Sequence, residues 1–481
     1  MTPAWRERVP PGPWDAVVVG AGPNGLAAAI TLAREGRHVL VLEAAAKPGG
    51  GLRSAELTEP GFVHDLCASV LGLGCLSDFF RSLPLEALGV RWATPALAAA
   101  HPFEDGSASV MEASVEATAR RLGGDGRAWQ AAFGPITRGW ERFASDVLAP
   151  PHLPRHPFLL ARFGLDALRS AAGFASRFAA EPAKALFAGF AAHSCLPLDD
   201  FGSASFGLVL GATGHKSGWP VVAGGSQRLA DALVAHLASF GGTLVTGARV
   251  SRLDELPSSR AVLLDVTPRQ LLDLAGDRLP SAYRKRLKRY RLGAGVFKID
   301  YALHAPIPWR AADCSRTATV HVGATLQEML VSERAVAEGR VSERPYVIVV
   351  QPTVCDATRA PAGRHTAWAY AHVPNGWTGD LRPAIESQIE RFAPGFRDAV
   401  RARSIWDPAR IEADNPNQAG GDIGGGSADL LQILARPVLS LDPYATALPG
   451  VTLCSSATPP GPGAHGLCGY FGARSALRRG A

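Results

Sequence analysis

The amino-acid sequence predicts an α/β protein that combines a doubly wound parallel sheet with an α+β region. Three observations support this fold class. Residues 15–43 place a strand-like run, a glycine turn, an Ala- and Leu-rich helix and a second strand-like run in succession. Residues 112–197 have helical periodicity, whereas residues 296–423 alternate strand-like runs with turns, which favours a mixed sheet roofed by helices. A chain of 481 residues is long enough for two domains.

The composition is that of a globular protein. Apolar residues make up 47% of the chain, and its 52 glycines and 37 prolines are spread along it, which argues against a fibrous or disordered protein. The formal charge of +6 rests almost entirely on arginine, since only six of the 49 basic residues are lysine. That bias is typical of a high-GC coding sequence. We therefore expect no nucleic-acid partner.

Cysteine usage and the N-terminal segment predict a cytoplasmic protein. The seven cysteines are odd in number and never spaced as CxxC, which indicates neither a disulfide framework nor a metal site. Residues 1–14 are polar and Pro-rich, unlike the apolar core of a signal peptide. No uncharged run reaches the length needed to span a membrane.

A glycine-rich turn follows the first strand-like run, Asp15–Val19. In a strand–turn–helix unit the first glycine permits the tight turn, the second lets the backbone approach a pyrophosphate, and the third lets the helix pack on the strand. We expect the helix over Leu26–Glu35, with Gly36 as its C-terminal cap. This segment predicts a dinucleotide-binding site. The turn consists of Gly20, Ala21, Gly22, Pro23, Asn24 and Gly25.

An acidic residue, Glu43, closes the second strand-like run, His38–Leu42, 18 residues after Gly25. A carboxylate at this place accepts hydrogen bonds from the ribose hydroxyls of an adenosine. It would repel a 2′-phosphate, so NADP is disfavoured. Both FAD and NAD contain an adenosine ribose, so this strand–helix–strand unit alone does not distinguish between the two cofactors.

The segment after Glu43 is rich in glycine and carries one arginine. It reads Lys47-Pro-Gly49-Gly50-Gly51-Leu-Arg53-Ser54 and is followed by Pro60-Gly61-Phe62-Val-His64-Asp65. It resembles the glycine–arginine motif of the FAD proteins grouped with amine oxidases and carotenoid desaturases. The resemblance implies FAD, with Gly50 and Gly51 close to the cofactor and Arg53 against its phosphate and ribityl region. A planar guanidinium suits phosphate oxygens.

Further blocks of the chain resemble the same family. In it, the residue at Val250 touches the adenine through its backbone. The last block is similar to the closing flavin motif of phytoene-dehydrogenase-related flavoproteins, with Pro462 in place of an expected glycine. This similarity implies that Ser456, Gly466 and Leu467 contact the cofactor. The blocks are Gly218–Ser226, Leu229–Val250, Arg359–Gly363, Trp368–Pro374, Phe392–Gly395, Gly420–Asp422 and Leu453–Tyr470.

A helix over Tyr470–Arg479 is expected after the glycine-rich loop Gly461–Gly469. Its N-terminus would offer unpaired N–H groups and a partial positive charge to the flavin, which would stabilise an anionic reduced flavin. A plain surface turn is the alternative.

Three residues are candidates for a catalytic role: Lys298, His215 and His465. The resemblance implies that Lys298, on the strand-like run Arg291–Ala302, holds a water at flavin N5; a lysine that reaches solvent is the alternative. Asp422 is a further polar candidate. Acid or base roles stay open, because sequence gives no distances.

The resemblance divides the chain into a discontinuous, doubly wound FAD-binding domain and an interleaved α+β substrate domain. The first comprises residues 12–72, 218–292 and 428–481, and the second residues 73–217 and 293–427. The basic run Tyr283–Arg291 could make peripheral contact with anionic lipid, although a solvated helix face is commoner.

The function we expect is that of an FAD-dependent dehydrogenase or desaturase. Flavin N5 would take hydride from a small-molecule substrate, which the Phe-rich helical insertion predicts to be lipophilic. Oxygen, a quinone or another external acceptor would then reoxidise the flavin. Alternatives are amine oxidase-like C–N oxidation, a redox-neutral polyene isomerase and a non-catalytic flavin-bound scaffold. NAD(P)H is not the expected reductant, because no second strand, glycine turn and acid follow one another in the sequence.

Overall fold

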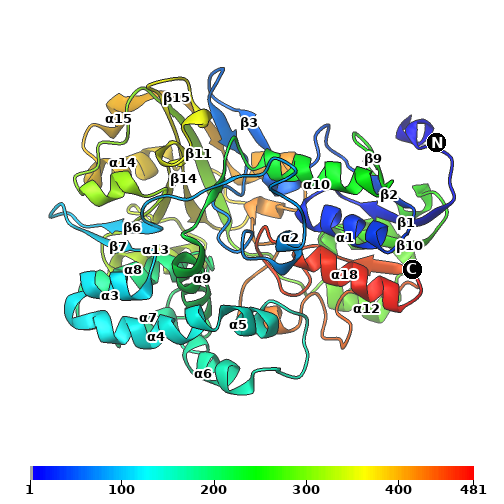
Figure 1. Ribbon diagram of the computed structural model, residues 1–481, viewed down its shortest axis with the longest axis horizontal. Coiled ribbons are helices and arrows are strands. Elements are labelled where there is room, and N and C mark those ends of the chain that lie inside the picture. Colours follow the sequence, from blue (N-terminus) through cyan, green and yellow to red (C-terminus); the bar gives the residue numbers. More distant parts are fainter. Residues whose placement is uncertain (1–3) are drawn as a thin grey trace.

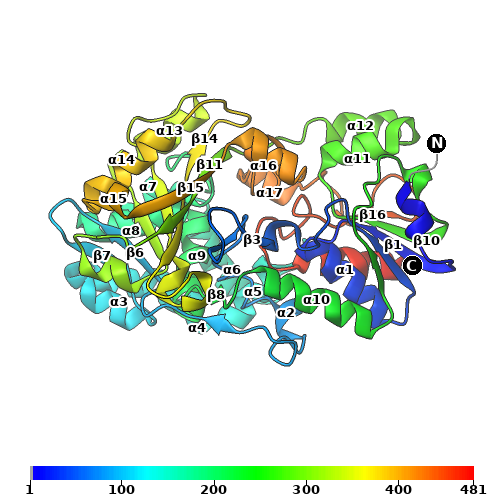
Figure 2. The ribbon, with the colours of Figure 1, turned by 90° about the horizontal axis from the view of Figure 1, so that it is seen from above.

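Two sheets organise the molecule in the computed structural model, which describes residues 4–481 (Figures 1 and 2). The first sheet has five strands in the order β16-β10-β1-β2-β9, and all of its pairings are parallel. Its strands come from within the three stretches predicted to form one domain; the domain boundaries stay a prediction. The strands are β1 (Trp14–Val19), β2 (Val39–Leu42), β9 (Thr243–Val245), β10 (Ser259–Leu264) and β16 (Val451–Leu453).

Helices cover both faces of this sheet, so the chain is doubly wound. One layer consists of α1 (Pro23–Arg34), α10 (Gln227–Ser239) and α18 (Leu467–Arg478), which share an apolar core with β1 and β2. Residues of α11 (Pro268–Ala275) and α12 (Ser281–Leu287) belong to the core on the opposite face. The two layers match the alternation of strand and helix in the sequence.

Two of these helices begin earlier than predicted. The N-terminal helix α1 starts at Pro23, because Gly22 caps it with extended backbone angles and proline suits the first turn. The C-terminal helix α18 starts at Leu467, not at Tyr470. A Cβ on Gly469 would lie 1.8 Å from the Asn24 carbonyl oxygen, so this glycine sits inside α18 where the helix crosses α1.

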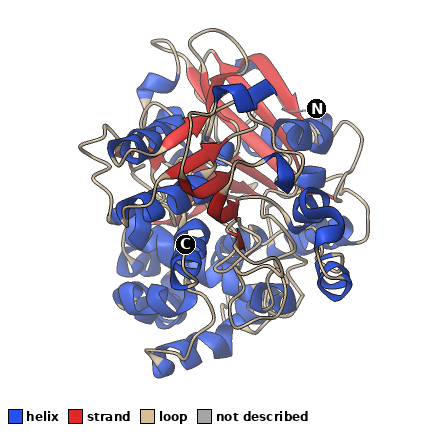
Figure 3. Ribbon diagram, turned by 90° about the vertical axis from the view of Figure 1, so that its right-hand side faces the viewer, coloured by secondary structure: helices blue, strands red, loops and turns tan. Residues whose placement is uncertain are grey.

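The second sheet has seven strands in the order β15-β11-β14-β13-β12-β6-β7, and its pairings are mixed. One face packs against α14 (Arg382–Phe392) and α15 (Phe396–Ala399), while the other faces the helical insertion and α13 (Leu326–Ala337). Figure 3 shows helices surrounding the strands. The strands are β6 (Ala99–Pro102), β7 (Ala108–Met111), β11 (Gly295–Leu303), β12 (Thr319–Val322), β13 (Val347–Val350), β14 (His365–Val373) and β15 (Val400–Trp406).

Residues 112–197 are helical, as their periodicity predicted, and the mixed sheet follows as expected. Most bulky aromatic residues of the insertion are buried, but Phe158 is 91% exposed. No helix within residues 4–481 combines the length and apolar character needed to cross a membrane. The insertion and α9 comprise α3 (Val115–Arg121), α4 (Gly126–Arg138), α5 (Trp140–Val147), α6 (Pro157–Ala167), α7 (Ala171–Ala175), α8 (Glu181–Ala192) and α9 (Ala204–Ser217).

Short elements connect the two halves. The hairpin of β3 and β4 lies near β14, and β5 pairs with β8. The remaining elements are β3 (Ser54–Glu56), β4 (Val63–Asp65), α2 (Asp78–Arg81), β5 (Trp92–Ala93), β8 (Val221–Val222), α16 (Pro408–Asp414) and α17 (Leu430–Leu434).

Candidate functional site

A single cavity of about 1240 Å³ joins the two halves. At one end it is lined by Gly20 and Glu43, which follow the carboxyl ends of β1 and β2. At the other end its wall includes Trp219, Trp368 and Tyr370. The volume exceeds the ~300–1,000 Å³ of an ordinary small-molecule pocket. It therefore has room for a large ligand and a second molecule beside it.

The first end of the cavity lies at the N-terminus of α1. Gly22 caps α1 without a side-chain hydrogen bond, and Gly22, Pro23 and Asn24 line the cavity. The N-terminus of a helix carries unpaired amide N–H groups that favour an anion. The Glu43 carboxylate accepts hydrogen bonds from Ala21 N at 2.6 Å and from Ala45 N at 2.8 Å. These contacts hold the carboxylate at the cavity edge.

Most of the predicted cofactor-binding residues line this cavity, and three do not. Gly25 packs against the turn, because a Cβ there would lie 2.0 Å from the Gly20 carbonyl oxygen. Gly466 and Leu467 lie at the start of α18, outside the wall. The residues on the wall are Gly20, Gly22, Pro23, Asn24, Glu43, Gly50, Gly51, Arg53, Val250 and Ser456.

Asp265, which the sequence interpretation missed, faces the glycine turn from the end of β10. Its Oδ2 accepts a hydrogen bond from Gly25 N at 2.9 Å. Burial raises the pKa of Asp265 to about 7 and the Glu43 carboxylate adds to this, while the Gly25 hydrogen bond opposes it. A neutral carboxyl group can lie beside a pyrophosphate without repelling it. In the sequence, the one indication that Asp265 belongs to the site is its position directly after a run of aliphatic residues.

The buried Asp265 makes stability depend on pH. Its pKa rises from the ordinary 3.8 to about 7 on folding, so the native state holds a proton that the unfolded chain releases between these values. This stabilisation is present below pH 4 and is lost as the pH rises through 7. Between pH 4 and pH 8 the wild-type protein should lose at most about 4 kcal/mol of its free energy of unfolding through this group. Asp265→Asn should not show that loss.

Urea unfolding of the flavin-free protein at pH 5 and pH 8 measures this effect. Asp277→Asn is the matched control, because the Asp277 side chain is 97% exposed. Parallel pH profiles for wild-type protein and Asp265→Asn would contradict the assignment.

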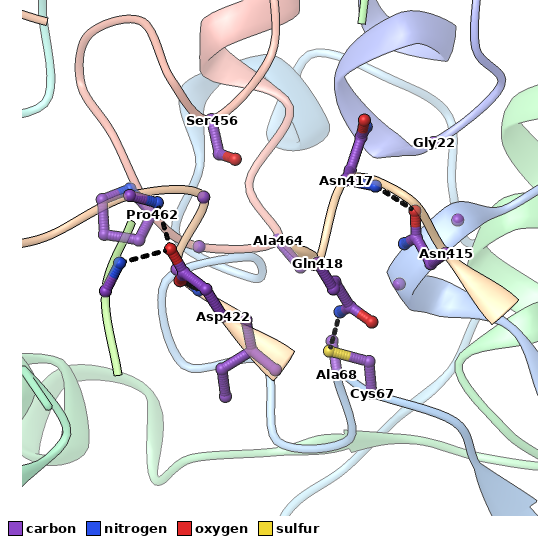
Figure 4. A pocket seen from close by; sticks show the side chains of 18 of the residues that line it. Gly22, Cys67, Ala68, Asn415, Asn417, Gln418, Asp422, Ser456, Pro462 and Ala464 are labelled. Atoms are coloured by element: carbon purple, nitrogen blue, oxygen red, sulfur yellow. Dashed lines mark hydrogen bonds between the residues drawn. The ribbon is translucent and has the colours of Figure 1, made fainter. Parts of the chain in front are cut away.

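Arg53 reaches the cavity and is held in place by α16. Its Nε donates to the Gly50 carbonyl oxygen at 3.0 Å, and its guanidinium pairs with the Asp414 carboxylate at the end of α16. Residues 415–418, which follow α16, also line the cavity and were not predicted (Figure 4). There Asn417 Nδ2 donates to the Asp265 carbonyl oxygen at 2.8 Å. This loop forms the cavity wall in the middle of the site.

Asp422 joins its own loop, residues 422–426, to the segment at Gly293 at the same part of the cavity. Its carboxylate accepts hydrogen bonds from the N–H groups of Gly293, Gly424 and Gly426 at 2.7–2.8 Å. Burial raises the pKa of Asp422, although these donors oppose the shift. Pro462 and Ala464 lie nearby in Figure 4.

None of the three catalytic candidates reaches the cavity wall in residues 4–481. Lys298 is buried on β11, where Nζ donates to Asp300 Oδ1 at 2.5 Å and to the Asp65 carbonyl oxygen at 3.1 Å. Its Nζ lies 5.6 Å from the ring centroid of Trp368, which does line the cavity. Lys298 is thus adjacent to the wall but already paired.

The two histidine candidates are buried within the protein. His215 Nε2 accepts a hydrogen bond from Trp129 Nε1 at 3.0 Å, and His465 Nδ1 accepts one from Leu467 N at 3.1 Å. Burial lowers the pKa of each ring to about 4. Both rings are therefore neutral at physiological pH and engaged as acceptors.

A buried ion-pair network holds the wall between the two halves. The fully buried Arg359 donates to Asp65 Oδ2 at 3.0 Å, to Asp356 Oδ2 at 2.8 Å and to the Val222 carbonyl oxygen at 3.0 Å. Asp65 also accepts hydrogen bonds from Ser54 Oγ and Ser69 Oγ, both at 2.6 Å. This network fixes the Cys67–Ala68 turn, which lines the cavity.

Fold and site together define an α/β protein with a Rossmann-like nucleotide-binding region, whose cavity continues to the second sheet. Residues 18–83 match the family model described as an NAD(P)-binding Rossmann-like domain.

Two curated relatives cover most of the chain. The rat protein named pyridine nucleotide-disulfide oxidoreductase domain-containing protein 2 is 26% identical over 99% of this chain and 96% of its own length. Streptomyces griseus phytoene dehydrogenase is 28% identical over 81% of this chain and 78% of its own length. A solved double mutant of putrescine oxidase has the same fold, with a TM-score of 0.60 at 16% identity, covering 97% of this chain and 98% of that one.

These similarities confirm the predicted resemblance and the α/β fold class. The chain is homologous to oxidoreductases of the phytoene-desaturase group, and its fold is that of the solved putrescine and cyclohexylamine oxidases. It is thus an oxidoreductase by homology.

Proposed function

We propose that the protein binds FAD and dehydrogenates a lipophilic small molecule. The observation that carries this proposal is the continuity of one cavity from the glycine turn to the aromatic wall. Bound FAD supplies an acceptor for hydride at N5. The protein's contribution is to bind the cofactor, exclude water and position the substrate.

The residues present fit FAD. A Cβ on Gly22 would lie 2.9 Å from Asp265 Oδ2 and 3.9 Å from Gly50 Cα, so the backbone can approach a pyrophosphate only with glycine there. Glu43 would accept the ribose hydroxyls, Val250 would meet the adenine through its backbone, and Arg53 would face the ribityl and phosphate region. The end of the cavity near Asp422 and Ser456 would take the flavin ring.

Apolar side chains dominate the wall of the substrate end, which favours a lipophilic ligand. Trp368 and Tyr370 lie on the same face of β14 with ring centroids 5.6 Å apart and planes 8° from parallel. Such a pair would also suit an amine beside a flavin, so amine oxidation is the second candidate function. The wall of the substrate end includes Phe206, Leu210, Trp219, Ile348, Val350, Trp368 and Tyr370.

Anaerobic reduction of the flavin tests the proposal. Purified protein incubated with FAD should become yellow, and a polyene or long-chain substrate should bleach it faster than a primary amine. NADH and NADPH should bleach it slowly, because Gly293–Gly295 leads into a strand and residues 424–426 form a loop, so neither provides a second nucleotide turn. Protein that binds no FAD would defeat the proposal. Bleaching by NADH or NADPH at catalytic rates would make the protein a reductase.

We also propose that the face around α17 contacts anionic membranes. Leu431 and Leu434, both on α17, are 76% and 61% exposed, respectively. The basic run adjoins them, since Arg291 pairs with Asp429 at 2.6 Å just before α17. Residues 424–428, which lead into α17, line the cavity. An apolar and cationic face is typical of peripheral membrane contact.

Co-sedimentation with vesicles measures this contact. Wild-type protein should bind phosphatidylglycerol vesicles better than phosphatidylcholine vesicles, and salt should weaken binding. Replacing Leu431 and Leu434 by Glu should reduce binding about tenfold. Val331→Glu is the control, since Val331 is 55% exposed on α13. Equal binding of all three proteins would show that this face does not contact the membrane.

A further inference from the structure

Two histidine side chains meet at the substrate end of the cavity. His193, which follows the last residue of α8, lines the cavity, whereas His321 of β12 is fully buried. Their Nε2 atoms are 2.9 Å apart, so one ring donates a hydrogen bond to the other. This is the one hydrogen bond of the His193 side chain within residues 4–481. His193 therefore keeps a second ring nitrogen, Nδ1, available on the cavity wall.

The mixed sheet sets the place of His321. In its register His321 lies opposite Ile348, and Ile348 lies opposite Tyr370, so the three side chains share one face. Ile348 and Tyr370 line the cavity, and His321 continues their row beneath α8. Gly189 of α8 makes room for the ring, because a Cβ there would lie 2.5 Å from His321 Nδ1. The packing of helix on sheet thus fixes the buried member of the pair.

Trp219 packs against both histidines. Its ring centroid lies 5.8 Å from that of His193 and 6.0 Å from that of His321, and both contacts are edge-to-face. The indole Nε1 donates to Thr213 Oγ1 at 3.0 Å, so it is not available to either histidine. Trp219 itself lines the cavity. His193 is therefore a polar group within a largely apolar wall.

Both histidine rings are neutral. Burial lowers the pKa of His193 to about 3 and that of His321 well below its ordinary value. In a neutral pair one Nε2 carries a proton and the other accepts the hydrogen bond. Nδ1 of His193 is then an acceptor if its own Nε2 is protonated, and a donor if it is not. A hydroxyl group, which both donates and accepts, matches either arrangement.

The substrate end of the cavity offers no partner for a charged ligand group. The charged side chains that line the cavity, within the part of the chain that the structure describes, belong to its nucleotide end and its middle. Two charged pairs behind the aromatic wall already satisfy each other: Lys298 Nζ lies 2.5 Å from Asp300 Oδ1, and His372 Nδ1 lies 2.7 Å from Glu333 Oε2. A carboxylate or ammonium group would therefore be buried without a counter-charge, which is costly. The charged lining residues fall in residues 43–53, 249–273 and 414–422.

We propose that His193 and His321 together form a binding site for a hydroxyl group of the substrate. This inference rests on the proposed function and narrows its substrate class to a lipophilic alcohol. Nδ1 of His193 makes the hydrogen bond to the hydroxyl group, and His321 holds the His193 ring through Nε2. The apolar wall takes the carbon chain. A hydrocarbon in the same place would leave Nδ1 without a partner, which weakens binding.

Binding of isoprenoid probes with the same carbon chain tests this hydroxyl site. Farnesol carries a hydroxyl group, farnesene carries no polar group, and farnesoate carries a carboxylate. Quenching of tryptophan fluorescence follows binding with or without flavin, because Trp219 and Trp368 line the cavity. The Kd of wild-type protein for farnesol should be at least about tenfold lower than that for farnesene or farnesoate. Equal Kd values for farnesol and farnesene, or tightest binding of farnesoate, would overturn the proposal.

Substitution of His193 tests the residue itself. His193→Phe keeps an aromatic ring but removes both nitrogens, so farnesol should bind about tenfold more weakly, close to farnesene. His193→Gln should keep part of the preference for farnesol, because its amide both donates and accepts. His236→Phe is the control, since His236 lies on α10 and is not part of the cavity wall. An unchanged preference in folded His193→Phe would refute the hydroxyl site, and the wild-type comparison decides the matter where a variant fails to fold.

The flavin function and the hydroxyl site can fail separately. Protein that prefers farnesol but takes up no FAD would refute the proposed function and leave the hydroxyl site standing. Protein that takes up FAD and binds farnesol and farnesene equally would refute the hydroxyl site alone.

Discussion

Gly22→Val is expected to abolish FAD binding and give a colourless protein. The new side chain would project from a Cβ already 2.9 Å from Asp265 Oδ2, into the space between the turn and Gly50. A pyrophosphate held by the N-terminus of α1 needs the same space. We expect the Kd for FAD to rise by at least about 100-fold, or roughly 2.7 kcal/mol.

Titration of the flavin-free protein with FAD, followed by flavin fluorescence, measures this change. Gly164→Val is the matched control, since a Cβ there meets nothing within 4 Å. Circular dichroism checks that both variants are folded. A folded Gly22→Val protein that still binds FAD with wild-type affinity would show that the pyrophosphate does not bind at this turn.

Arg359→Met should be among the most destabilising single substitutions in the chain. It would leave the carboxylates of Asp65 and Asp356 buried without their shared cation. Breaking a buried pair in this way costs about 3–5 kcal/mol. Because the network holds the turn at Cys67, the variant should also bind FAD more weakly.

Urea unfolding at pH 7 provides the measurement. Arg260→Met is the control, because Arg260 is 70% exposed and 3.8 Å from Asp15, and such surface pairs contribute about 0–1 kcal/mol. A loss of less than about 1 kcal/mol in Arg359→Met would mean that the two carboxylates find other partners.

The nucleotide end of the site could be predicted from local sequence patterns. The turn at Gly20–Gly25 and the acid at Glu43 lie within one strand–helix–strand unit, so their spacing in the chain fixes their spacing in the fold. The mixed sheet and the helical insertion were likewise predicted from periodicity. The start of α18 was misplaced, because Cys468 and Gly469 look like loop residues until α1 is known to pass beside them.

The substrate end could not be predicted, because its groups come from separate elements. Trp219, Ile348 and Trp368 lie on the turn after α9 and on strands β13 and β14, and no pattern in the chain links them. Lys298, His215 and His465 have side chains that can transfer protons. Whether such side chains reach the cavity depends on their burial and on their hydrogen bonds within the protein, which the sequence does not reveal. Asp265 followed an ordinary buried strand, and its role depends on a turn 240 residues away.

That separation along the chain also sets the order of events during synthesis. Strand β1 pairs with β10, and β10 pairs in turn with β16, whose residues leave the ribosome long after those of β1. Until α18 follows, one of the two helices that share the apolar core with α1 is missing. Long-range pairing of this kind is slow and leaves apolar surface open to chaperones or aggregation. A nascent chain that ends before residue 451 carries the whole Gly20–Glu43 unit and still cannot complete the sheet beneath it.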